Sequence, residues 1–302
     1  MSEPTTTTPQ RSGFVGVAGR PNAGKSTLIN RLVGEHVAIV SPVAQTTRRV
    51  VRAVGQYDSD QVVFVDLPGS QKPVDRLTTR MQAAVKHSLN DVDAVLWVLD
   101  GSDEPKAGER IVADLVFGAG VPVVVAVNKI DRMKPDQVLE RLAQVVGIIG
   151  DREYVAIVPV SATEGDGTDG LLSELRGVIP EGPSYFPADE MTDMRVDERV
   201  SEYVREATLG YLREELPHAT IVEVEEILDD DGAVHIEAII WVERDSQVGI
   251  VVGKGGETIK KIGTDARASI EDMLDRKVML NLRVKVRKNW RDDDTQLERW
   301  GL

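Results

Sequence analysis

Short apolar runs alternate with amphipathic segments between residues 14 and 179. The runs are rich in valine and have the length and β-branched composition of buried strands. In the segments between them, apolar residues recur every three or four positions, as on one face of a helix. This alternation predicts βαβ units and a mainly parallel sheet with both faces covered. The expected strands are 14–18, 50–54, 62–66, 94–99, 121–127 and 155–160, and the expected helices are 27–33, 77–89, 106–117, 135–146 and 170–178.

The pattern changes after residue 182. Residues 180–187 are rich in Pro and Gly, which predicts the end of a helix and a domain boundary. Beyond them we expect a helix stopped by Pro217, two strands joined by an Asp-Gly turn, a glycine turn between two helices and a basic strand, in the order α–β–β–α–α–β. The expected ranges of the helices and strands are 197–215, 220–228, 233–242, 257–274 and 278–287. We therefore predict a disordered tail over 1–12, a first domain over 13–182, a linker over 183–196 and a second domain over 197–302. In the linker, Tyr185 and Phe186 are expected to anchor one domain on the other.

Composition narrows the class of protein. The chain has 302 residues and no cysteine, which excludes disulfides, thiolate metal sites and cysteine nucleophiles and fits a cytoplasmic protein. No apolar stretch approaches the roughly 20 residues that span a bilayer. The net charge of −14 argues against nucleic acid as a partner. Residues 248–291, however, carry 11 Lys and Arg against 5 Asp and Glu, so a polyanion is expected to bind there.

A complete G-x-x-x-x-G-K-[ST] motif follows the first predicted strand and precedes the first predicted helix. It reads Gly19-Arg20-Pro21-Asn22-Ala23-Gly24-Lys25-Ser26. Backbone N–H groups and the start of the helix would point at a phosphate here. Lys25 would supply a charge for the β- and γ-phosphates, and the Ser26 hydroxyl would bind Mg²⁺. A glycine-rich turn before an ordinary helix is the alternative, and the strand–loop–helix context argues against it.

Three more polar motifs follow predicted strands of the same sheet. Asp66-Leu67-Pro68-Gly69 offers a carboxylate for Mg²⁺ and an N–H group for a γ-phosphate, or else a simple strand-ending turn. In Asn128-Lys129-Ile130-Asp131, the Asp131 carboxylate could accept both donors of a guanine base. Asn128 either reaches the base or braces the loop, and the Lys129 stem can lie along the base plane. The 161–163 motif, Ser-Ala-Thr, either offers an N–H to the guanine oxygen or caps a helix. The residues expected to contact nucleotide are Asn22, Ala23, Gly24, Lys25, Ser26, Thr27, Asp66, Leu67, Pro68, Gly69, Asn128, Lys129, Asp131, Ser161 and Ala162.

These motifs, in this order and spacing, resemble the translation-factor-related GTPases. The first motif and the segment Gln45-Thr46-Thr47-Arg48 narrow the resemblance to the Era family. The resemblance implies that 45–49 is a switch loop in which one Thr hydroxyl binds Mg²⁺ while the γ-phosphate is present. We favour Thr47, with Thr46 a close second; a Thr pair that merely begins the next strand is the alternative. Lys25, Thr47 and Gly69 are thus the expected catalytic residues, and Ser26, Thr47 and Asp66 the expected Mg²⁺ ligands.

The sequence departs from many GTPases at the position after Gly69. Ser70 stands where a water-orienting Gln is usual, and Gln71 would project in another direction. Slow intrinsic hydrolysis is expected, because positioning of the attacking water is a substantial part of phosphoryl-transfer catalysis. In related GTPases that lack this Gln, an Asn at the place of Asn22 helps to hold a K⁺ ion, which would offset charge that develops beside the β–γ bridge.

The second domain resembles a type II KH domain, the type with its extra helix at the N-terminus. Its signature turn is Gly253-Lys254-Gly255-Gly256, where bare backbone and helix N–H groups can approach RNA phosphates closely. A glycine-rich turn between two helices is the alternative. The expected RNA contacts are the turn itself with Lys254, an apolar floor of Ile250, Val251 and Ile259, and the cations Lys260, Lys261, Arg283, Lys285, Arg287 and Lys288. Trp290 fits either a core or a stacking platform.

An α/β P-loop GTPase domain followed by a smaller α+β KH domain is the Era-family architecture. It implies a monomeric cytoplasmic factor that binds the single-stranded 3′ end of small-subunit ribosomal RNA and assists maturation of that subunit. Implied cofactors are GTP or GDP and Mg²⁺, with K⁺ as a candidate. The resemblance also implies loose contact with the inner face of the cell membrane, for which the sequence contains no anchor. In the expected cycle, GTP orders the loops around Thr47 and 66–69, their contact with the second domain frees the 253–256 surface, and hydrolysis reverses this.

Two rival functions stay open. One is an RNA-binding scaffold with a largely inactive nucleotide site, for which the missing Gln is the support. The other is a metabolic P-loop kinase, which would leave the 128–131 motif and the second domain without a purpose.

Overall fold

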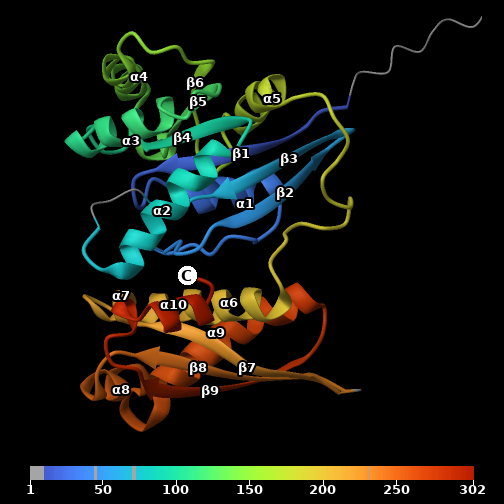
Figure 1. The fold of residues 1–302 in the computed structure, drawn as a ribbon, viewed down its shortest axis with the longest axis vertical. Helices are drawn as coiled ribbons and strands as arrows, with labels where there is room; N and C mark the ends of the chain where they lie inside the picture. The colour runs from blue at the N-terminus through green and yellow to red at the C-terminus, as the bar shows by residue number, and fades with distance from the viewer. Residues whose placement is uncertain (1–9, 44–45, 70–72, 231) are drawn as a thin grey trace, which may run out of the picture. The chain divides into compact units, whose positions relative to one another are not determined.

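The computed structural model describes residues 10–43, 46–69, 73–230 and 232–302, which fall into two compact units (Figure 1). The first unit comprises Met1–Ala38, Val50–Gln71 and Gln82–Asp193, and the second comprises Ile39–Arg49, Lys72–Met81 and Met194–Leu302. The predicted linker is thus divided, with residues 183–193 in the first unit. Two short segments of the N-terminal half, which we assigned to the first domain, group with the second unit instead.

The first unit is built on a six-stranded sheet in the order β2-β3-β1-β4-β5-β6. All neighbouring strands are parallel except β2 and β3, which are antiparallel. The strands are β1 (Ser12–Gly19), β2 (Val51–Tyr57), β3 (Asp60–Asp66), β4 (Ala94–Asp100), β5 (Val123–Asn128) and β6 (Ala156–Pro159). The predicted mainly parallel sheet is confirmed, and the carboxyl ends of its parallel strands lie along one edge.

Helices cover both faces of this sheet, as its valine-rich strands require. The helical elements are α1 (Lys25–Val33), α2 (Arg76–Asn90), α3 (Ala107–Phe117), η1 (Ile130–Arg132), α4 (Pro135–Ile149) and α5 (Thr168–Val178). Apolar residues of α2, α3 and α4 pack with β4 and β5 in one core cluster, around the fully buried Trp97. Helices α1 and α5 contact each other and strands of the same sheet. Burial on both faces explains why the strands are continuous apolar runs.

The two ends of the first unit are tied to its sheet. The predicted tail ends earlier than residue 12, because the Arg11 N–H donates to Asp60 Oδ1 (2.9 Å) and Ser12 begins β1. Residues 1–9 of that tail lie outside the described residues. In the predicted linker, the Gln61 side chain accepts bonds from the N–H groups of Tyr185 (2.8 Å) and Phe186 (3.0 Å). These two aromatic residues therefore fasten the connecting segment to the first unit itself.

The second unit has a three-stranded sheet in the order β7-β8-β9, with β7 and β8 antiparallel and β8 and β9 parallel. The strands are β7 (Ile221–Asp229), β8 (Val234–Val242) and β9 (Val278–Val286). The helical elements are α6 (Val196–Tyr211), α7 (Leu216–Ala219), α8 (Asp245–Val252), η2 (Lys254–Gly256), α9 (Glu257–Leu274), η3 (Trp290–Asp292) and α10 (Asp294–Arg299). Figure 1 shows α6 and α9 lying along the sheet, and both contribute to one buried core. The order α–β–β–α–α–β is as predicted.

The predicted end of the helix 197–215 was wrong. Helix α6 ends at Tyr211 rather than at Glu215, because Leu212 adopts an extended conformation with ψ of 153°. Pro217 does not stop this helix; it lies near the start of the short helix α7, where its missing N–H costs nothing. Among the residues that the structure describes, no helix is both long enough and apolar enough to cross a bilayer.

Candidate nucleotide-binding site and nucleic-acid interface

The loop 19–26 runs from the end of β1 into α1 and has room for backbone only at its two glycines. A Cβ atom on Gly24 would lie 2.3 Å from the Asn128 amide nitrogen, and one on Gly19 would lie 2.3 Å from the Val98 carbonyl oxygen. Gly24 also has a φ of +92°, a conformation that L side chains rarely adopt. Both glycines are therefore required by the local structure, and the loop ends at the N-terminus of α1, where an anion is favoured.

Lys25 is held inside this loop. Its side chain is buried, and its ammonium lies 3.4 Å from the carbonyl oxygens of both Gly19 and Arg20. Burial lowers the pKa of Lys25, while the carboxylates of Asp66 and Glu109 act in the opposite direction. These two hydrogen bonds are long, so a phosphate that enters the loop would be a stronger partner for the ammonium.

Two of the three predicted Mg²⁺ ligands are neighbours. The Ser26 hydroxyl donates to Asp66 Oδ2 (2.7 Å) at the end of β3. Hydroxyl and carboxylate oxygens beside a phosphate loop suit Mg²⁺. Thr47, the third, belongs to the 39–49 segment of the second unit. In that segment the Thr46 hydroxyl donates to the Val43 carbonyl (2.7 Å).

The loop after β3 approaches the phosphate loop. A Cβ on Gly69 would lie 3.0 Å from the ring of Pro21, so Gly69 must be a glycine or the loop must shift. Leu67 and Pro68 are buried beside it. Gln45, Ser70 and Gln71, which the sequence singled out in the two switch loops, lie outside the described residues.

Asn128 braces the site, which is one of its two predicted roles. Its amide nitrogen donates to the Ala23 carbonyl (2.9 Å), and its amide oxygen accepts from the Ala162 N–H (3.0 Å). The residue is buried and joins three loops that are far apart in the sequence. Asp131 accepts a hydrogen bond from Ser161 Oγ (2.7 Å), which orients the carboxylate that we expect to bind guanine. The Lys129 ammonium donates to the Asn22 carbonyl (2.7 Å), so its stem crosses the same region.

The glycine turn between α8 and α9 is open on its outer side. Gly255 and Gly256 have φ of +61° and +81°, and a Cβ on either would meet nothing within 4 Å. Gly253 differs, because a Cβ there would lie 2.2 Å from Thr258 Oγ1. Lys254 is exposed between them. The turn thus presents bare backbone and one cation at the N-terminus of α9, which suits a phosphate.

The apolar floor predicted beside this turn was partly wrong. Ile250 is 55% exposed and Ile259 is half-buried, so both can be reached. Val251 is completely buried in the core between α8 and the sheet, because the short helix turns that side chain inward. Lys260 and Lys261 are exposed on α9, and Lys261 forms an ion pair with Glu257 (2.7 Å).

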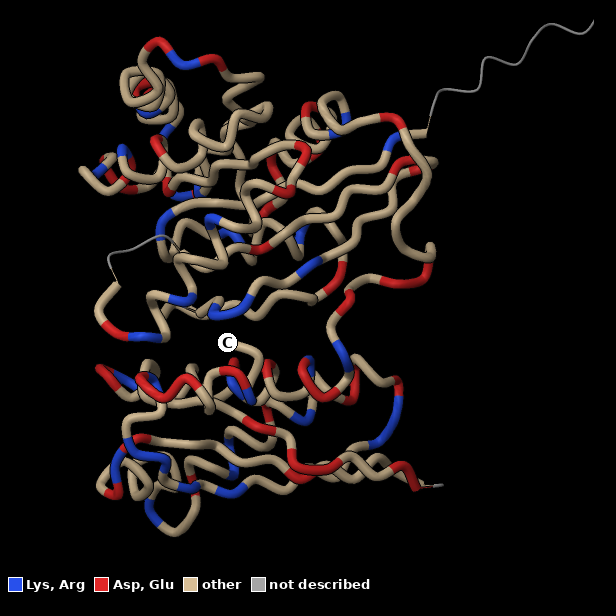
Figure 2. Tube along the Cα trace, viewed as in Figure 1, with Lys and Arg blue, Asp and Glu red and all other residues tan. Residues whose placement is uncertain are grey.

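Two of the remaining predicted cations, both on β9, lie among carboxylates. Arg283 forms ion pairs with Glu225 and Glu237, and Lys285 with Glu225 (3.5 Å). Figure 2 shows charges of both signs along this unit. These strand cations are therefore weaker candidates for RNA than the turn. Trp290 is fully buried and its indole N–H donates to the Ala219 carbonyl (3.1 Å), so it belongs to the core.

Comparison with known proteins identifies both halves of the chain. Residues 14–129 match a family described as 50S ribosome-binding GTPase, and residues 215–291 match the KH domain. A protein named GTPase Era, from Lacticaseibacillus paracasei, is 43% identical over 291 residues, which is 96% of each chain. The chain belongs to the Era family of GTPases.

Solved Era structures cover nearly the whole chain. Era in complex with MgGDPNP and nucleotides 1506–1542 of 16S ribosomal RNA matches with a TM-score of 0.92 and 35% identity, over 97% of this chain and 99% of that one. A single-substitution variant of Aquifex aeolicus Era bound to GDP·AlF₄⁻ matches with a TM-score of 0.92 and 34% identity, over 96% of this chain and 99% of that one.

Three charged residues around the nucleotide loops of this Era-family chain were missed by the motif analysis. Asp100, at the end of β4, forms an ion pair with Lys129, and its place at a strand end was the available signal. Arg20 forms an ion pair (3.6 Å) with the buried Glu109 of α3. Burial raises the pKa of Glu109, and Arg20 opposes this. Nothing in the sequence pattern distinguished Glu109 from the other acidic residues of a surface helix.

Proposed function

We propose that this protein hydrolyses GTP, binds the 3′ end of small-subunit ribosomal RNA and assists maturation of the small ribosomal subunit. One observation carries the proposal: a braced phosphate loop and an open, cationic glycine turn occur together in a chain that matches Era over 96% of its length. The relative that matches over 97% of the chain was solved with a GTP analogue and 16S ribosomal RNA.

We assign the nucleotide chemistry to residues whose local geometry suits it. The backbone of 22–27 would cradle the phosphates, with Lys25 as a charge that strengthens its contacts as negative charge develops. Ser26, Asp66 and Thr47 would hold Mg²⁺, which when bound neutralises the phosphate oxygens. The Gly69 N–H would meet the γ-phosphate. Asp131, oriented by Ser161, would select guanine, while Asn128 keeps the loops in place.

RNA binding is tested by electrophoretic mobility shift with an oligonucleotide that spans nucleotides 1506–1542 of 16S ribosomal RNA. We expect the single strand to bind, with an affinity that differs between a GTP analogue and GDP, because coupling between two ligands is reciprocal. The complementary oligonucleotide is the control. Equal binding of both strands, or of neither, would contradict the proposed partner.

Base selection is tested by Asp131→Asn. The amide oxygen can still accept the bond from Ser161, but the side chain no longer accepts both donors of guanine. We expect GTP affinity to fall by about a hundredfold, the equivalent of about 3 kcal/mol for charge-assisted bonds, and xanthosine triphosphate affinity to rise. Competition binding with GTP, XTP and ATP measures this. Unchanged preference for GTP would remove Asp131 from the base site and reopen the kinase alternative.

We also propose that K⁺ assists hydrolysis through Asn22. This residue has a φ of +63° in the phosphate loop, and its carbonyl is held by Lys129. A monovalent cation beside the β–γ bridge would offset developing charge. We expect GTP turnover to be about tenfold faster in KCl than in NaCl, and Asn22→Ala to remove the difference. Equal rates of the wild-type protein in the two salts would rule out this role.

Two further parts of the proposal rest on the resemblance alone. We propose a monomer, which analytical ultracentrifugation tests. We also propose a cytoplasmic location with loose contact at the inner face of the membrane. Co-sedimentation with vesicles of bacterial phospholipids tests the contact, and protein that remains in the supernatant would exclude it.

A further inference from the structure

Residues 290–302, which we call the C-terminal cap, follow the last strand of the second unit and contain η3 and α10. Trp290 and Trp300 of the cap contact each other edge to face, with ring centroids 5.6 Å apart. The cap packs in a small apolar cluster that also contains Ile221 of β7. Both segments that the N-terminal half contributes to this unit, 39–49 and 73–81, contact the cap.

The 39–49 segment is held on both sides of Thr47. Arg48 is 5% exposed, and its guanidinium donates to the carbonyls of Thr220 (2.6 Å), Pro217 (2.8 Å) and His218 (3.2 Å). It also lies over the Trp290 ring, 5.6 Å from the centroid. On the other side of Thr47, the Thr46 carbonyl accepts a bond from Arg205. A residue expected to bind Mg²⁺ therefore sits between two points fixed to the second unit.

Burial makes this attachment close to all-or-none. Burial, with the neighbouring Arg205 charge, lowers the pKa of Arg48 to about 9. Burial acts to raise the pKa of Glu202, but Arg205, with Arg49 and Arg48, outweighs it, and the pKa of this carboxyl is lowered. Hydrogen bonds offset the cost of burying charges of this kind. Losing one partner would leave a costly unpaired group, so the contacts should form or break together.

The 73–81 segment is attached to the cap in a similar way. Leu77 and Met81 of α2 are buried against Trp290, Leu297 and Trp300. Arg80 adds polar contacts with the cap. It forms ion pairs with Asp294 (3.2 Å) and Glu298 (3.0 Å) and donates to the Leu302 carbonyl (2.8 Å). In the sequence, this segment follows the loop that contains Gly69.

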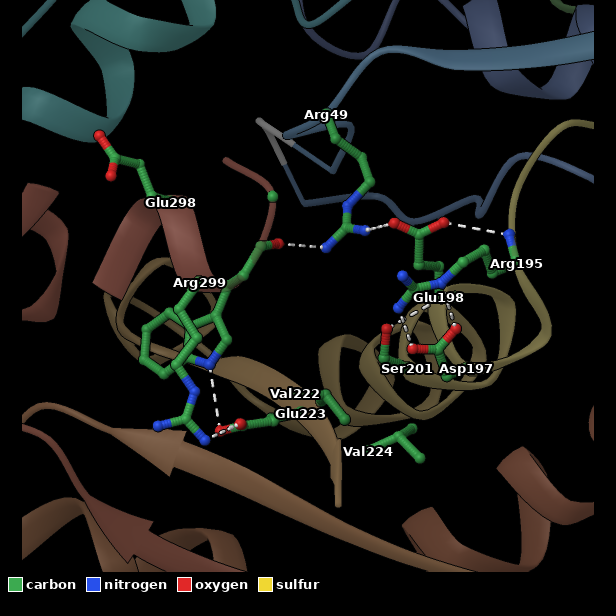
Figure 3. Close-up of a pocket in the computed structure, with 12 residues that line it drawn as sticks. Arg49, Arg195, Asp197, Glu198, Ser201, Val222, Glu223, Val224, Glu298 and Arg299 are labelled. Atoms are coloured by element: carbon green, nitrogen blue, oxygen red, sulfur yellow. Dashed lines mark hydrogen bonds and ion pairs between the residues drawn. The ribbon is translucent and has the colours of Figure 1, made fainter. Parts of the chain in front are cut away.

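Arg49 completes the attachment at the far end of the cap. Its guanidinium donates to the Trp300 carbonyl (2.8 Å) and pairs with Glu198 of α6 (3.3 Å; Figure 3). Both segments that adjoin the expected γ-phosphate contacts are therefore fixed to the same 13 residues.

One arginine of the cap connects the 73–81 segment with the RNA-binding turn. Arg291 forms ion pairs with Asp75 (2.8 Å) and with Glu243 (3.8 Å). Glu243 lies just before α8, and its N–H, like that of Arg244, donates to Gln247 Oε1 (2.9 Å). Helix α8 ends at Val252, directly before Gly253, the first residue of the glycine turn. Asp75, Arg291, Glu243 and α8 form a continuous chain of contacts inside the second unit.

We propose that the C-terminal cap receives the nucleotide state from the 39–49 and 73–81 segments and that Arg291 relays it to α8 and the glycine turn. This inference rests on the proposed function. Arg291 acts as a positioning residue, through its ion pairs with Asp75 and Glu243. Movement of Asp75 or of Trp290 changes the ion pair with Glu243, and α8 then alters the turn that binds phosphate.

The test compares Arg291→Gln with Arg276→Gln in the full-length protein. Arg276 forms an exposed ion pair with Asp229 at the tip of the hairpin, so its substitution removes the same charge from the same unit. The readout is the ratio of the RNA dissociation constants in GDP and in a GTP analogue, with the 1506–1542 oligonucleotide as probe. In the wild type we expect these two dissociation constants to differ by at least fivefold, in either direction. Arg276→Gln should retain this difference, and Arg291→Gln should reduce it to less than twofold. In both variants, nucleotide affinity measured without RNA should differ from that of the wild type by less than about twofold.

Arg48→Lys supplies a second variant. It keeps the charge but cannot donate to three carbonyls at once, so it should also lower the ratio. Thermal unfolding confirms that each variant is folded. A folded Arg291→Gln protein with the full wild-type ratio overturns the relay. A wild-type protein that binds no RNA or hydrolyses no GTP overturns the proposed function instead, and a wild-type ratio of one overturns the coupling itself.

Discussion

Replacing Lys25 by alanine should reduce the rate of GTP hydrolysis by at least about a hundredfold. The ammonium is buried in the phosphate loop and has only two long hydrogen bonds to carbonyl oxygens, so it is positioned to bind phosphate oxygens instead. Charge that develops on the β–γ bridge would lose its nearest cation, and loss of one such preorganised group costs 10²–10³ in rate. Phosphate release measured under single-turnover conditions reports this step.

The control for this experiment is Lys106→Ala. Lys106 is an exposed lysine of the same unit that pairs with Asp103 and lies outside the phosphate loop. Its loss should leave turnover within about twofold, as expected for an exposed ion pair. RNA binding by Lys25→Ala without nucleotide should equal that of the wild type. If Lys25→Ala and the wild type hydrolyse GTP equally slowly, the nucleotide site is inactive and the protein is an RNA-binding scaffold.

The sheet of the first unit and its loops were predictable from the sequence for two reasons. Parallel strands buried on both faces must be apolar throughout, so runs such as the one that became β5 stood out. Parallel strands also end at one edge, so polar motifs after separate strands had to meet there. The meeting of Ser26 with Asp66, and of Asp131 with Ser161, follows from this.

Contacts that depend on three-dimensional distance were not predictable. That Asn128 braces the loop depends on its distance to the Ala23 carbonyl. Val251 and Ile250 are adjacent aliphatic residues, and only the packing of α8 on its sheet decides which is buried. Arg48 reads as a loop cation, yet it is buried, because three carbonyls in the second unit accept its hydrogen bonds.

The C-terminal cap was predictable only in part. Two of the four tryptophans in the chain fall within its 13 residues, which suggests packing against something large. No periodicity indicates what that partner is, because the 39–49 and 73–81 segments are more than 200 residues away in the sequence. Long-range contacts of this kind leave no local signal.

Gly255→Asp should weaken RNA binding by about tenfold to a hundredfold while GTP hydrolysis is retained. Gly255 has a φ of +61°, which Asp tolerates better than most residues, and a Cβ there meets nothing within 4 Å. The new carboxylate would face the RNA phosphate, and like charges in contact cost several kcal/mol. Gly253→Asp is a poorer test, because its Cβ would lie 2.2 Å from Thr258 Oγ1 and would distort the turn.

Gly255→Asn is the matched control, because Asn has the same shape, adopts positive φ readily and carries no charge. Dissociation constants for the 1506–1542 oligonucleotide, measured from low to moderate salt, separate charge from shape. The Asp variant should differ from the Asn variant most at low salt, because its effect is repulsion of the phosphate. Equal affinity of the two variants would mean that no phosphate approaches Gly255. RNA would then have to bind elsewhere on the unit, and the exposed Ile250 with Lys260 would be the next surface to test.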